Sequence, residues 1–121
     1  MKDKKIKICF DIDGVICSVN KKDYKFSSPI KKNINYINKL YREYFIIFFT
    51  ARHMGRNNDN KKLAMQGAKK LTLFQLNKWG VKYDKIYFGK PSYDIFIDDK
   101  SLFYKKNWIN TLKLKLRSQK V

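Results

Sequence analysis

The amino-acid sequence predicts an α/β fold with three layers and a mostly parallel sheet. Short runs of strand-forming apolar residues alternate along the chain with longer segments whose apolar residues recur at helical spacing. Polar residues, mainly Asp, follow directly after several of these runs, as is typical of the carboxyl ends of parallel strands. The order strand, helix, strand, helix, strand, strand requires crossover connections, which place helices on the sheet faces. The 121 residues are enough for a single domain, residues 1–121.

The first half of the chain supplies two strands and one helix. Residues 5–10 (KIKICF) alternate in polarity and predict the first strand. Residues 16–28 contain Asn and Ser and are expected to form a loop or flap. A helix begins after Pro29, where Ile and Tyr recur at helical spacing up to Tyr44. Residues 45–49 (FIIFF) are apolar throughout and favour a central strand that is buried on both faces.

The second half supplies one helix, two strands and a tail. A polar loop over 52–62 precedes a predicted helix over 63–79, which Gly80 ends. Residues 85–88 (KIYF) predict a third strand, and residues 94–97 (DIFI) predict a fourth that ends at an Asp-Asp pair. The tail over 108–121 is expected to form an edge strand or a short helix, with fraying over about 113–121.

Composition excludes several classes of protein. The 28 Lys and Arg against 10 Asp and Glu give a net charge of +18, which attracts phosphates of any kind, nucleic acid included. Because the lysines are spread over the whole chain, we interpret this charge as compositional. No apolar run approaches the length of a membrane span, so no membrane partner is expected. Two cysteines make neither a disulfide scaffold nor a zinc site, and a cytoplasmic location is expected.

Carboxylates follow two of the predicted strands. Asp11 and Asp13 come after the first strand, and Asp98 and Asp99 come after the fourth. Because the carboxyl ends of parallel strands share one edge, these side chains are expected to converge there. Four carboxylates in one crevice repel each other unless their pKa values rise or a cation binds. Oxygen ligands without His or Cys favour a hard ion, usually Mg²⁺.

Phosphate-binding groups are expected at the same edge. Thr50 ends the second strand and offers a hydroxyl, while Lys90 lies in a loop between the third and fourth strands. The backbone N–H groups near Ala51 and over 12–14 are suited to phosphate oxygens. A carboxylate beside a cation, with a second carboxyl two residues on, suits phosphoryl transfer through an aspartyl phosphate.

Four segments in order, FDIDGVIC, IIFFTAR, FGKPSYD and IDD, resemble the motifs of the haloacid dehalogenase superfamily. Together they span most of the chain, from Phe10 to Asp99. The resemblance implies a Rossmann-like three-layer α/β/α fold and a Mg²⁺-dependent phosphatase. The chain looks closest to the small phosphatases that act in capsule and lipopolysaccharide sugar synthesis.

The resemblance implies a role for each matching residue. Asp11 would be the nucleophile and a Mg²⁺ ligand. Asp13 would give its backbone carbonyl to Mg²⁺, and its side chain would protonate the leaving oxygen and then activate water. Thr50 and Ala51 would bind phosphoryl oxygens, and Lys90 would neutralise the phosphate.

The remaining implied ligands are Asp98 and Asp99, and either of them is suited to direct contact with Mg²⁺. Superfamily members often carry a large cap domain, but the loops here are too short for one. Substrate contacts are therefore expected from the flap (Tyr24) and from the loop after the second strand (Arg52 and His53).

The function expected from these residues is hydrolysis of a small phosphomonoester, a sugar phosphate in surface-polysaccharide synthesis. Two alternatives stay open. A nucleic-acid 3′-end phosphatase is favoured by the +18 charge but lacks a coherent basic and aromatic stripe in the sequence. A non-catalytic domain that binds anions or nucleic acid would not need both Asp11 and Asp13.

Overall fold

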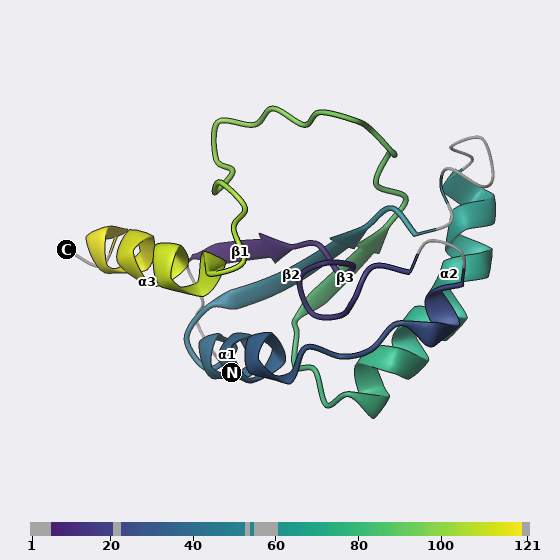
Figure 1. The fold of residues 1–121 in the computed structure, drawn as a ribbon, viewed down its shortest axis with the longest axis horizontal. Coiled ribbons are helices and arrows are strands. Elements are labelled where there is room, and N and C mark those ends of the chain that lie inside the picture. Colours follow the sequence, from purple (N-terminus) through teal and green to yellow (C-terminus); the bar gives the residue numbers. More distant parts are fainter. Residues whose placement is uncertain (1–5, 21–22, 53, 55–60, 120–121) are drawn as a thin grey trace.

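The computed structural model describes residues 6–20, 23–52, 54 and 61–119. The described elements follow the order strand, short 3-10 turn, helix, strand, helix, strand, helix (Figure 1). They are β1 (Lys7–Phe10), η1 (Tyr24–Phe26), α1 (Lys31–Leu40), β2 (Phe45–Thr50), α2 (Lys61–Lys78), β3 (Lys85–Phe88) and α3 (Trp108–Gln119). The fold is therefore a small α/β domain, and the first three predicted strands and the first two predicted helices are confirmed.

The three strands form one parallel sheet in the order β1-β2-β3. Phe10 is level with Phe48 on β2, and Phe48 is level with Ile86 on β3. Because the register is parallel, the carboxyl ends of all three strands meet at one edge. This edge is where the sequence places Asp11 and Thr50.

The sheet has one covered face and one open face. On β2, Ile46, Phe48 and Thr50 are buried, while Phe45, Ile47 and Phe49 on the other face are only partly buried. Both crossovers, β1-α1-β2 and β2-α2-β3, step in the same direction, so the usual right-handed connection puts α1 and α2 on the same face (Figure 1). Along the open face runs a hollow of about 420 Å³. Its lining comprises Cys9, Ile47, Phe49, Tyr87, Phe88 and Gly89. The described helices thus form one layer, and the second expected helical layer is not seen among the described residues.

The tail resolves into a helix, α3, instead of an edge strand. Trp108, Ile109, Leu112 and Leu116 recur at helical spacing and are all buried. The Trp108 ring lies 5.6 Å from the Phe10 ring and 6.2 Å from the Tyr36 ring, centroid to centroid, so α3 packs on β1 and α1. Within the described part of the chain, no helix is both long enough and apolar enough to cross a membrane.

The predicted fourth strand over 94–97 is wrong for this structure. Residues 91–104, here called the arch, leave the sheet after β3 and loop away from it before α3 (Figure 1). Every residue from 91 to 100 is exposed, and the exposed fractions of Ile95 and Ile97 are 81% and 90%. A strand needs a neighbouring strand to accept and donate its backbone hydrogen bonds. The alternating pattern of DIFI predicts an extended backbone, but it does not show whether the chain can reach such a neighbour.

Candidate active site

Asp11 lies at the carboxyl end of β1 and remains open to solvent. Its Oδ1 accepts a hydrogen bond of 2.7 Å from the Ile12 N–H, and its Oδ2 lies 3.6 Å from the Lys90 Nζ. The side chain is 42% exposed. Burial raises the pKa of Asp11, and the nearby Lys90 charge opposes that rise. A carboxylate that is fixed in place yet accessible is suited to attack an incoming electrophile.

Lys90 is held beside Asp11 by its backbone and by aromatic rings. Its N–H donates to the Thr50 carbonyl at 3.0 Å, which fixes the loop after β3 against the end of β2. Its Nζ lies 5.3–5.9 Å from three ring centroids, those of Phe49, Tyr93 and Phe96. Burial lowers the pKa of Lys90, but a hydrogen bond with Tyr93 and the Asp11 charge outweigh it and raise the pKa overall. Lys90 therefore presents a stable positive charge at Asp11.

Asp13 faces inward and binds Arg52. The Arg52 Nε donates to Oδ2 at 3.0 Å, and its Nη2 donates to Oδ1 at 2.9 Å, in a bidentate pair. The Arg52 side chain has no exposed surface, and its Nη1 also donates to Thr72 and Gln75 of α2. The buried Arg52 guanidinium thus holds Asp13 and α2 together, and the expected contact between Arg52 and substrate stays a prediction.

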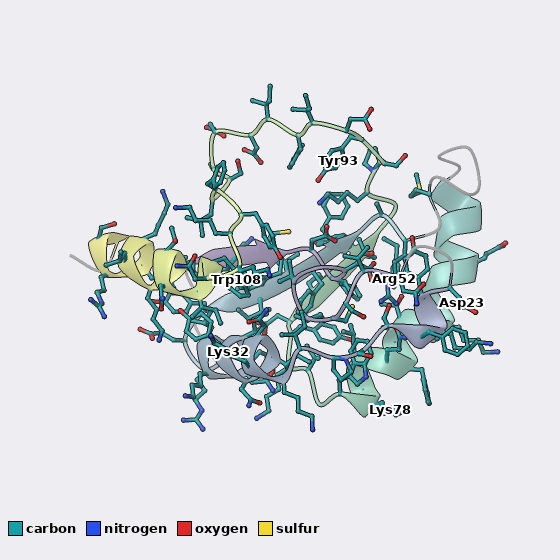
Figure 2. The ribbon with its side chains drawn as sticks, viewed as in Figure 1. Asp23, Lys32, Arg52, Lys78, Tyr93 and Trp108 are labelled. Carbon is teal, nitrogen blue, oxygen red and sulfur yellow. The ribbon has the colours of Figure 1, made fainter. Side chains whose placement is uncertain are left out.

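The flap is attached to the same buried cluster. The Arg52 guanidinium stacks over the Tyr24 ring at 4.9 Å, and the Gln75 side chain donates to the Tyr24 carbonyl at 2.8 Å. Figure 2 shows Arg52 beside α2. The Cys17 thiol donates to Asp13 at 3.4 Å, and burial raises its pKa to about 12. Tyr24 thus lies against a buried cation, and the flap is fixed by it.

A tight turn follows β1. Gly14 has a φ of 86°, in the left-handed region that favours glycine, and its N–H donates to the Cys17 carbonyl at 2.8 Å. The Tyr104 hydroxyl, at the far end of the arch, donates to the Gly14 carbonyl at 2.7 Å. The turn therefore receives contacts from both the flap and the arch.

Thr50 and Ala51 end β2 at the same edge. Thr50 is only 1% exposed, and its Oγ1 accepts a hydrogen bond of 3.2 Å from the Arg52 N–H. Ala51 is partly exposed. The backbone of this segment thus lies at the sheet edge, while the Thr50 hydroxyl is used within the loop.

Asp98 and Asp99 do not join this site in the chain as described. Both are exposed residues of the arch, and Asp98 Oδ1 accepts a hydrogen bond of 3.0 Å from the Lys100 N–H. That bond, and a second one with Asp99, lower the pKa of Asp98. The expected meeting of four carboxylates is absent, since the described residues contain no group of three or more His, Cys, Asp or Glu able to hold a metal. One chain in this conformation therefore does not fit the expected Mg²⁺ site.

Sequence reasoning missed several residues of the site. Cys17 and Gln75 complete the Arg52 cluster, and Tyr93 and Tyr104 of the arch contact Lys90 and Gly14. None of these contacts has a local signal, because each joins residues that are far apart in the sequence or lies within an irregular segment. His53, expected to contact substrate, lies outside the described residues.

Comparison with known proteins supports the fold. No protein-family model and no curated protein matches this chain. Among solved structures, it is similar to a structural-genomics (MCSG) target from Vibrio cholerae. The two share 25% sequence identity with a TM-score of 0.74, over 91% of this chain and 98% of the other. The architecture described above is thus similar to that of a protein whose structure is known by experiment.

Proposed function

We propose that this chain is a phosphomonoester hydrolase that uses Asp11 as its nucleophile. The observation that carries the proposal is the Asp11–Lys90 pair at the carboxyl edge of the sheet. Asp11 is accessible, its Oδ1 is oriented by the Ile12 N–H, and Lys90 supplies a positive charge 3.6 Å from its Oδ2. Phosphoryl transfer requires in-line positioning and neutralisation of charge. The fixed Asp11 carboxylate supports the first requirement, and the Lys90 charge supports the second.

The proposed reaction has two steps. In the first, an Asp11 carboxylate oxygen bonds to phosphorus and the bond from phosphorus to the ester oxygen breaks, so that the alcohol leaves and takes up a proton. In the second, water attacks phosphorus, the bond to Asp11 breaks, and phosphate is released. Lys90 would offset the phosphoryl charge, and the backbone N–H groups after β2 would contact phosphoryl oxygens.

Asp13 is the expected proton donor, but its two oxygens both accept from Arg52. For Asp13 to protonate a leaving group, its carboxyl would have to turn from Arg52 toward the open edge of the sheet. Asp13 follows Asp11 by two residues in the same short loop, so it stays near the carboxylate that would attack phosphorus.

The haloacid dehalogenase resemblance supports the same reaction and adds an expected need for Mg²⁺. It also implies the three-layer form of the fold, of which the described helices supply one layer. The expected substrate is a small sugar phosphate in surface-polysaccharide synthesis, because the motifs look closest to those of the small phosphatases that act in that synthesis. The substrate panel should therefore contain sugar phosphates together with 3′-phosphorylated oligonucleotides.

The proposal is tested with the full chain and an aryl phosphate. We expect Asp11→Asn to reduce turnover by at least 10³-fold, because an amide does not form the phosphoryl intermediate. Glu43→Gln, an exposed acid near the end of α1, should keep full turnover. The resemblance alone implies a metal requirement, and on that ground chelation of divalent cations should stop the reaction and added Mg²⁺ should restore it. Unchanged turnover in Asp11→Asn would refute the nucleophile.

A further inference from the structure

The arch is an apolar, strand-like segment without a partner. Ile95 and Ile97 are 81% and 90% exposed, and Phe103 is 77% exposed. Within the described residues, no backbone hydrogen bond is found for residues 94–97. Exposed apolar side chains that form a contiguous patch mark an interaction site more often than singly scattered ones do.

The sheet offers a matching open edge. β1 pairs only with β2, so the backbone groups on its outer side have no strand beside them among the described residues. The arch also ends beside β1, since Tyr104 bonds to Gly14 and Trp108 packs on Phe10. An extended segment that lies along an open edge satisfies both sets of backbone groups.

The arch is too short to fill this edge in its own chain as a parallel strand. Lys90 is fixed at the end of the sheet by its bond to Thr50. If Asp98 is level with Asp11 on a strand beside β1, Asp94 lies three strand spacings from β3, or about 14 Å across the sheet. Asp94 also lies about 13 Å from the level of Asp11 toward the amino end of β1. The distance from Lys90 to Asp94 would then be about 19 Å, whereas the chain from Lys90 to Asp94, four residues on, spans about 14 Å at most when extended.

We propose that two copies of this chain exchange their arches, so that residues 94–97 of each copy form a strand along the open β1 edge of the other. In an exchange the distance from Lys90 to the β1 edge of its own chain no longer matters, because each arch joins the β1 edge of the other copy. It also closes under two-fold symmetry, as domain exchange commonly does. The five most exposed apolar side chains of the arch contribute on the order of 100 Å² each, or about 1,000 Å² for two arches. The surfaces that receive the two arches lose a similar area, so the exchange buries about 2,000 Å² in total, which is enough for a stable dimer.

Charge favours the same pairing. Residues 91–99 hold three of the ten acidic residues of the chain, Asp94, Asp98 and Asp99, and no Lys or Arg. The rest of the chain, Lys100 of the arch included, is strongly basic, so the acidic residues 91–99 are attracted to a second copy. An exchanged strand would bring Asp98 and Asp99 of one copy to Asp11 of the other. The register that sets Asp98 level with Asp11 rests on the proposed function, whereas the mass and protection measurements below do not depend on it.

The first experiment measures mass and backbone protection. Light scattering on the full chain should give a dimer, and hydrogen exchange should show amides 94–97 protected in the dimer and unprotected after dilution to monomer. The double variant Ile95→Asp, Ile97→Asp should be a folded monomer by circular dichroism. Leu114→Asp, a matched change at an exposed residue of α3, should stay dimeric. A monomeric wild-type chain, or a dimer whose 94–97 amides exchange freely, would overturn the proposal.

The second experiment separates exchange from simple docking. Asp11→Asn and the double variant Asp98→Asn, Asp99→Asn are expected to be inactive alone. After they are refolded together, half of the dimers are mixed, and each mixed dimer holds one intact site, so about a quarter of wild-type turnover should return. No recovery, with an active wild type, would contradict the exchange. If the wild type is inactive, the proposed function fails, and the mass and protection data still decide the exchange.

Discussion

A buried ion pair organises the site at the level of single residues. Arg52 reaches from the end of β2 to Asp13, Gln75 and Thr72, and so joins the loop after β1 to α2. Such a pair specifies one arrangement, because either partner left alone would be a buried, uncompensated charge. Arg52 is therefore a positioning residue for the site.

Loss of Arg52 should be strongly destabilising. We expect Arg52→Ala to lower the free energy of unfolding by about 3–5 kcal/mol, because it leaves Asp13 with a desolvated charge. The control is Lys25→Ala, whose exposed pair with Asp23 at 3.9 Å should contribute less than about 1 kcal/mol. Urea unfolding of the two variants checks the contrast, and equal small losses in both would contradict the role given to Arg52.

Asp11 should reduce stability at neutral pH. Its pKa is raised in the fold, so the folded state binds the proton more tightly than the unfolded state does. The resulting stabilisation is complete below the unfolded pKa of 3.8 and is lost as the pH rises through the raised folded value. Because the side chain is 42% exposed and screened by solvent, Asp11→Asn should raise the melting temperature at pH 7 by only about 1–3 °C. The rise should vanish near pH 3 in calorimetry, and a constant difference at both pH values would refute it.

At the level of elements, the turn after β1 couples the flap to the arch. Gly14→Ala should cost about 1–2 kcal/mol of stability because of its positive φ, and should also reduce turnover by displacing the loop that contains Asp13. Gly80→Ala, at a φ of 69° with no heavy atom within 4 Å of the added Cβ, should cost similar stability but leave turnover intact. Parallel unfolding and turnover measurements distinguish the two, and equal turnover in both would count against the coupling.

The elements themselves were largely predictable from periodicity. The run FIIFF and the spacing of Ile34 and Ile37 carry local signals that the tertiary fold preserves. The arch was not predictable, since DIFI has the pattern of a strand and only the fixed position of Lys90 limits its reach. Likewise Asp11 could be placed at a strand end from its motif, whereas the inward turn of Arg52 depends on a partner 39 residues away.

At the scale of the whole molecule, the net charge of +18 opposes the compact state. A sheet with one open face also leaves apolar surface exposed to water. The exposed apolar surface favours burial, whereas the repulsion between like charges opposes it. Salt should weaken the repulsion between exposed charges that lie more than about a Debye length apart, roughly 10 Å at 0.1 M. Anions that bind a specific site should stabilise the chain further, beyond screening.

Inorganic phosphate should therefore stabilise the chain more than chloride does at equal ionic strength. Chloride screens the whole charge, whereas phosphate also binds beside Lys90 and the backbone after β2, in the folded state alone. At about 100 times its Kd, a bound anion adds about 2.7 kcal/mol, which raises the melting temperature by several degrees. Lys90→Met should remove this extra rise and keep the chloride response, while Lys78→Met, an exposed residue at the end of α2, should keep both. An extra rise that survives Lys90→Met would place the anion elsewhere on this basic surface and would remove the main support for phosphate chemistry at Asp11.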